Sequence, residues 1–74
     1  MTAPLTFAAG PNAIIHKTGQ RLDREETMRC RAYFTDVLAE VGASNERKRN
    51  AAEMIAQIDA AIAESFPNQQ ERVA

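Results

Sequence analysis

The feature that most constrains the fold is a pair of apolar segments with helical spacing, separated only by residues 42–45. Apolar side chains that recur every three or four residues are typical of amphipathic helices. A connection this short makes two helices antiparallel neighbours. The pattern therefore predicts an all-α fold, an antiparallel helical hairpin with helices at about 23–41 and 45–66.

The first predicted helix has a start signal and a stop signal. Asp23 can act as the N-cap, and Glu26 follows three residues later, which is the spacing of a capping box. Gly42 can adopt the left-handed conformation that commonly ends a helix. The apolar stripe between these signals, which we expect to be buried, consists of Cys30, Phe34, Val37, Leu38 and Val41, with Tyr33 at its edge.

The second predicted helix begins after Ser44, a good N-cap residue, and Pro67 stops its pattern. Its main apolar stripe consists of Ala51, Met54, Ile55, Ile58 and Ile62, extended by Phe66. A second stripe consists of Ala52, Ala56, Ala60 and Ala63. Small side chains at this spacing would let another helix approach closely, although alanine is also the best helix former.

The segment before the helices is an arm with two short apolar runs, at 5–8 and 13–15. Pro11 followed by Asn12 between the runs favours a type I turn. The arm is therefore either a short β-hairpin or an irregular segment, since an isolated hairpin is hardly stable in water. These patterns divide the chain into an N-terminal arm at 1–19, a helical hairpin at 20–67 and a polar tail at 68–74.

The size of the chain predicts that it needs a partner. A core built from 74 residues is marginal, and small chains gain stability from disulfides, metals or oligomers. Cys30 is the single cysteine, which excludes a disulfide within the chain and favours a reducing, cytoplasmic location. No apolar run approaches the roughly 20 residues of a membrane span. We expect a homodimer in which two hairpins form a four-helix bundle.

Few residues are suited to chemistry. Catalysis needs converging groups with tuned pKa values, and His16 is the only histidine. Cys30 lies on the apolar stripe, where an inert core thiol is the simpler interpretation. These two residues do not make a metal ligand set, and no glycine-rich phosphate loop is present. The sequence therefore predicts no enzyme, no cofactor and no metal site.

The function indicated by these features is protein binding. We expect a small regulator or inhibitor that occupies a partner protein's surface; the alternative is an accessory or structural subunit of a larger assembly. The basic triplet 47–49 supports a second alternative, a nucleic-acid-binding repressor, although the net charge is only −1. Abundant alanine, with more arginine than lysine, suggests a bacterial or phage origin. The predicted partner-binding residues are Leu5, Phe7, Ile14, Ile15, Arg47 and Arg49.

Overall fold

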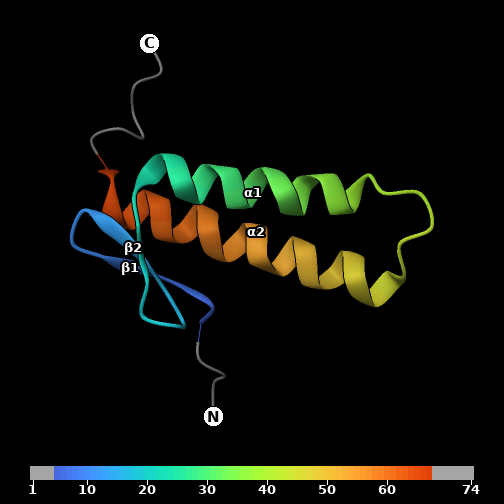
Figure 1. Cartoon of the computed structure of the whole chain (residues 1–74), viewed down its shortest axis with the longest axis horizontal. Coiled ribbons are helices and arrows are strands. Elements are labelled where there is room, and N and C mark those ends of the chain that lie inside the picture. Colours follow the sequence, from blue (N-terminus) through green and yellow to red (C-terminus); the bar gives the residue numbers. More distant parts are fainter. Residues whose placement is uncertain (1–4, 68–74) are drawn as a thin grey trace.

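The computed structural model describes residues 5–67 and shows a small α+β fold (Figure 1). The elements are β1 (Phe7–Gly10), β2 (Ala13–His16), β3 (Arg21–Leu22), α1 (Arg24–Leu38) and α2 (Asn45–Ser65). The strands form one antiparallel sheet in the order β1-β2-β3. The predicted all-α class, a helical hairpin forming a four-helix bundle, is therefore wrong. The predicted tail at 68–74 lies outside the described residues.

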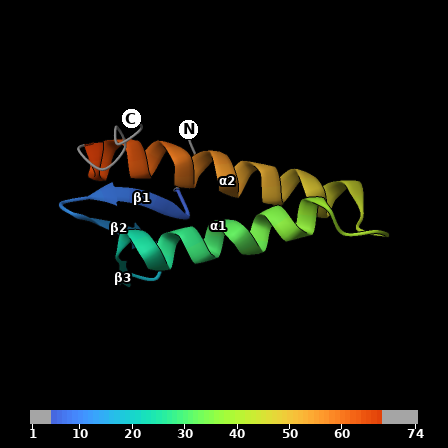
Figure 2. The ribbon, with the colours of Figure 1, turned by 90° about the horizontal axis from the view of Figure 1, so that it is seen from above.

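The sheet lies against the end of the helix pair where α1 begins and α2 ends (Figures 1 and 2). The 21 residues of α2 span about 31 Å, whereas a strand of four residues spans about 13 Å. The strands therefore extend along less than half the length of α2. Neither helix among residues 5–67 has both the length and the apolar composition needed to cross a membrane.

The core lies between the sheet and the helices. Alternation along the strands directs Phe7, Ile14 and Leu22 to one face of the sheet, where they pack with residues of α2. The α2 members of this cluster are Ile58, Ala61 and Ile62, followed by Phe66 just beyond the helix. In the predicted four-helix bundle, a second copy of the chain would cover the apolar seam between the helices. The chain's own sheet covers part of that seam instead.

The turn between β1 and β2 shows why asparagine suits position 12 and glycine suits position 10. Asn12 has a φ of 56°, and a positive φ at the second central position is a feature of a type II turn, not of the predicted type I turn. Gly10 is required by packing, because a Cβ there would lie 2.8 Å from Cγ1 of Ile15. A side chain at position 10 would therefore require the Ile15 side chain to shift.

The outer edge of β1 is closed by side chains of α2. The Gln57 Oε1 atom accepts hydrogen bonds from the backbone N–H groups of Thr6 and Phe7, at 2.9 and 3.2 Å. Eight residues further along α2, the Ser65 hydroxyl accepts from the Gly10 N–H at 3.1 Å. Eight helical residues span about 12 Å, which matches the length of the short strand. These polar side chains take the place of a neighbouring strand and protect the sheet edge.

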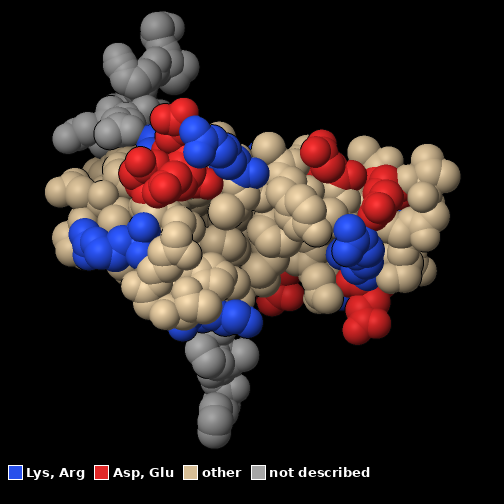
Figure 3. Space-filling model, viewed as in Figure 1, with Lys and Arg blue, Asp and Glu red and all other residues tan. Residues whose placement is uncertain are grey.

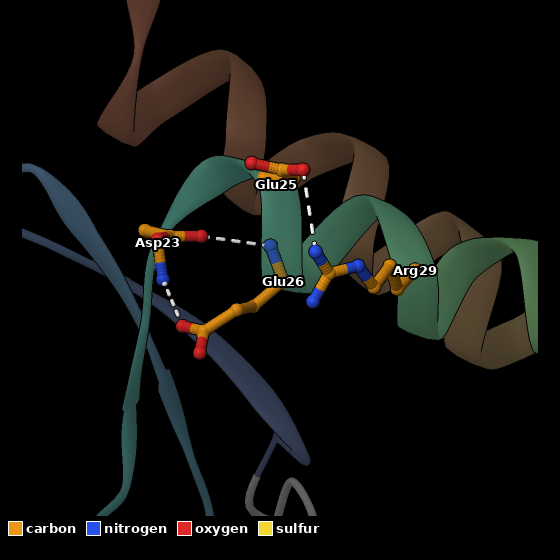
Figure 4. Close-up of polar contacts among 4 residues, drawn as sticks. All are labelled: Asp23, Glu25, Glu26 and Arg29. Carbon is orange, nitrogen blue, oxygen red and sulfur yellow. Dashed lines mark hydrogen bonds and ion pairs between the residues drawn. The ribbon is translucent and has the colours of Figure 1, made fainter.

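The start of α1 confirms the predicted capping box (Figure 4). The Glu26 N–H donates to Asp23 Oδ1 at 2.7 Å, and the Asp23 N–H donates to Glu26 Oε1 at 2.9 Å. Glu25 and Arg29 form an exposed ion pair one turn further on, at 3.3 Å. Ser44 is likewise the N-cap of α2, since its hydroxyl accepts from the Arg47 N–H. Both helix starts follow from local sequence signals.

The end of α1 differs from the prediction. The helix stops at Leu38, three residues short of position 41, because bonds between residues three apart tighten its last turn. The Ala39 N–H donates to both Thr35 and Asp36 carbonyls, and the Glu40 N–H donates to the Val37 carbonyl. Leu38, the last residue of the helix, and Val41, which lies beyond it, are both exposed, although both were expected to be buried.

Candidate binding surfaces

The fold removes two of the predicted partner-binding residues from the surface. Phe7 is 4% exposed and Ile14 is fully buried, because both pack against α2. In the folded chain neither side chain is available to anchor a partner. Leu5 remains 53% exposed, and Ile15 lies half-buried on the outer face of the sheet. Of the four predicted arm residues, Leu5 and part of Ile15 therefore remain accessible to a partner.

The two predicted arginines lie near the start of α2, at the other end of the helix from the sheet. Arg47 is already engaged, since its Nε donates to Glu40 Oε1 at 2.9 Å. That hydrogen bond to Glu40 is the main cause that raises the pKa of Arg47, and the neighbouring Tyr33 hydroxyl adds to the effect. Arg49 is exposed. Basic and acidic side chains are interspersed over the face shown in Figure 3, which does not favour a nucleic-acid interface there.

Leu5 lies at a groove between the start of the sheet and α2. We define the Leu5 groove as the cavity of about 380 Å³ that is lined from β1 and its approach by Leu5, Phe7 and Ala9, and from α2 by Glu53, Ala56, Gln57, Ala60, Ala61 and Glu64. Ala56 and Ala60 are both exposed and lie one helical turn apart. The groove therefore joins part of the arm to part of the alanine stripe noted in the sequence.

The Leu5 groove is acidic at both ends. Glu53 and Glu64 are eleven positions apart on α2, which corresponds to about 16 Å along the helix. Neither carboxylate forms an ion pair within residues 5–67, where the acidic partners are Glu25, Glu40 and Asp59. An apolar segment with a cation at each end would complement this arrangement.

A second surface is centred on an aromatic side chain of α1. Tyr33 is 56% exposed and stands edge-to-face against the half-buried Phe34, with ring centroids 5.2 Å apart. Both rings line two cavities, one of about 340 Å³ toward Arg47 and one of about 420 Å³ toward His16. We call this region, with Tyr33, Phe34 and the two cavities, the Tyr33 surface.

Tyr33 was not among the predicted partner-binding residues. The available signal was its position at the edge of the apolar stripe, where an aromatic side chain is only partly buried. Tyrosine and arginine are enriched among the residues that dominate interfaces, and Tyr33 lies beside Arg47. The Tyr33 surface is therefore a second candidate contact region.

The groups with potential chemistry do not converge. Cys30 is half-buried, and His16 Nδ1 lies 3.0 Å from the hydroxyl of its near neighbour Thr18. Within the described part of the chain, no three His, Cys, Asp or Glu side chains are grouped so that they could hold a metal ion.

Comparison of the chain with protein-family models, with curated proteins and with solved structures found no match.

Proposed function

We propose that this chain is a small non-enzymatic binding protein, a regulator or inhibitor that acts by occupying a surface of another protein through its Leu5 groove. One observation carries the proposal: Leu5, a large and half-exposed apolar side chain, lines the same groove as the exposed Ala56 and Ala60. Fully burying a leucine is favourable by about 1.5–3 kcal/mol, so covering the exposed half of Leu5 contributes roughly 1 kcal/mol.

The alanine side of the groove suits a helical partner. The distance between two packed helices depends on the side chains at the contact, and short side chains permit a close approach. Ala56 and Ala60 present only methyl groups to a partner along one turn of α2. A close approach would bring a partner's apolar side chains within reach of Leu5. The partner segment is therefore an amphipathic helix.

The charges of the groove define the partner further. Glu53 and Glu64 would attract Lys or Arg side chains spaced about 16 Å apart, and such pairs govern the rate and specificity of association. The partner segment accordingly has an apolar face flanked by basic residues. We place this encounter in the cytoplasm, where the thiol of Cys30 stays reduced.

Filling the Leu5 groove is expected to abolish capture of the partner. The 74-residue chain is used as bait in a lysate of its native host, beside Ala60→Trp and the matched control Ala63→Trp. Ala63 is exposed on the same helix but does not line the groove. Quantitative mass spectrometry should show a stoichiometric partner retained by the wild type and by Ala63→Trp, and lost with Ala60→Trp.

Charge reversal gives an independent readout of the same interaction. Glu53→Lys combined with Glu64→Lys should slow association with the purified partner at least tenfold at low salt. The free energy of unfolding of this double variant should change by less than about 0.5 kcal/mol for each substitution, because both positions are exposed. If Ala60→Trp and Ala63→Trp lose the partner equally, the contact is made elsewhere. The same follows if the charge reversal leaves the association rate unchanged.

A further inference from the structure

We infer that the chain forms a two-fold symmetric dimer in which Tyr33 of each copy enters the cavity beside His16 of the other copy. This contact uses the Tyr33 surface and leaves the Leu5 groove open. It also differs from the four-helix bundle expected from the sequence, because the seam between the helices is partly covered by the sheet. The second copy is identified by three features: the shape of the surface, one hydrogen-bonding group, and the charges at the rim.

The surface carries both a projecting ring and a cavity able to receive one. Tyr33 is more than half exposed, and its position is supported by edge-to-face contact with Phe34 and by Arg47. The cavity of about 420 Å³ lies directly beside it, because Tyr33 and Phe34 form one of its walls. Its other apolar lining includes Leu22 and Cys30. The volume is ample for a phenol ring.

His16 supplies a hydrogen-bond donor at this cavity. The backbone N–H of Thr18 donates to His16 Nδ1 at 3.2 Å, and a backbone N–H cannot accept. In the neutral imidazole the proton therefore lies on Nε2. Edge-to-face contact with Phe7, at 5.3 Å between centroids, fixes the orientation of the ring. No acceptor for Nε2 lies within residues 5–67, and the Tyr33 oxygen of a second copy would provide one.

The charges around the Tyr33 surface are compatible with a second copy. A two-fold axis places the same patch against itself, so a patch with charges of one sign repels its copy. The cavity on the other side of Tyr33 has both signs at its rim, Arg47 and Glu46, with Glu40 paired to Arg47. Opposite charges can therefore pair across the axis. The Leu5 groove, with an acid at each end, would repel its own copy.

Light scattering after size exclusion tests the dimer with the intact chain. The wild type should show a mass of about 16 kDa, twice the 8.2 kDa of one chain, at high micromolar concentration. Tyr33→Ala should be monomeric at the same concentration. Leu38→Ala is the matched control, since Leu38 is an exposed apolar residue of α1 that lines neither cavity of the Tyr33 surface. Circular dichroism should show the same helix content for all three chains.

The hydrogen bond has its own test. The two-fold axis makes two copies of this bond. Tyr33→Phe and His16→Phe each keep an aromatic ring and remove both copies, so each should raise the dimer dissociation constant about five- to 150-fold. The double variant should dimerise no more weakly than the weaker of the two single variants, because both changes remove the same pair of bonds. In a mixed sample of labelled and unlabelled chains, nuclear Overhauser effects should connect the Tyr33 ring of one copy to Leu22 of the other.

Three results would overturn the dimer. A wild-type monomer at millimolar concentration excludes it. A dimer that persists in folded Tyr33→Ala, or intermolecular contacts that avoid Leu22 and Cys30, assigns the interface to another surface. If Tyr33→Ala fails to fold, Tyr33→Phe and the intermolecular contacts decide the question.

Discussion

Replacing Ile58 with alanine is expected to lower the free energy of unfolding by about 2–5 kcal/mol, the range for large-to-small changes in a packed core. Ile58 is fully buried and lies in one cluster with Phe7 and Ile14 of the sheet. A chain of 74 residues has a total stability of about 4–11 kcal/mol, so this change removes a large fraction of it.

Urea denaturation measures the effect of Ile58→Ala, and two neighbours serve as controls. Ile55 lies on the same helix but is only half-buried, so Ile55→Ala should cost clearly less. From the sequence alone Phe34→Ala would be expected to match Ile58→Ala, whereas the half-buried position of Phe34 now predicts a smaller loss. Losses of similar size at all three positions would mean that α2 does not face the sheet as described.

Deleting residues 1–15 is expected to unfold the chain. The deletion removes β1 and most of β2, and with them the buried side chains Phe7 and Ile14. Each fully buried side chain of this size contributes about 1.5–3 kcal/mol, so the two together contribute about half of the chain's total stability. The deletion also exposes Ile58 to water. A sequence-based view of the segment as an arm predicts the opposite, namely that helix content survives.

Far-ultraviolet circular dichroism of the truncated chain distinguishes these expectations. We expect most of the helical signal to be lost at 25 °C, because a helical pair without its tertiary contacts is marginal in water. The point variant Leu5→Ala is the control for changes in the same segment, and its spectrum should match that of the wild type. A truncated chain with native helix content and a cooperative melt would show that the helices are stable alone.

The helices were predictable from the sequence because their signals are local. Asp23 and Glu26 form the capping box that their spacing indicates, and Ser44 caps α2. The end of α1 was not predictable in this way, since the apolar pattern continues to Val41 although the helix ends at Leu38. Periodicity records which side chains favour burial, and it does not record where backbone hydrogen bonding changes.

The sheet was not predictable as part of the core because its stability comes from tertiary contacts. β3 is only two residues long and has no periodic pattern of its own. The hairpin depends on Gln57 and Ser65, which lie 50 or more positions later in the sequence than the backbone groups they bind. Without these contacts Phe7 and Ile14 look like exposed anchors.

The candidate surfaces likewise depend on tertiary contacts and not on local sequence signals. Once the sheet covers one end of the helix pair, Leu5 meets the alanine side of α2, and Tyr33 is left at the margin of the covered region. The exposed alanines could be noted in the sequence, but their pairing with Leu5 required the orientation of β1. Tyr33 and His16 are seventeen positions apart in the sequence. They line one cavity because of where β2 lies, which the sequence pattern does not show.

Native-state amide hydrogen exchange tests most directly whether the strands and helices share one core. The slowest amides of β2 and those of α2 around Ile58 should exchange with the same opening free energy, equal to that of global unfolding, because they belong to one cooperative unit. Exchange of the β2 amides through an opening several kcal/mol less costly than that of α2 would contradict this. The sheet would then be a detachable arm, and Phe7 and Ile14 would again be available to a partner.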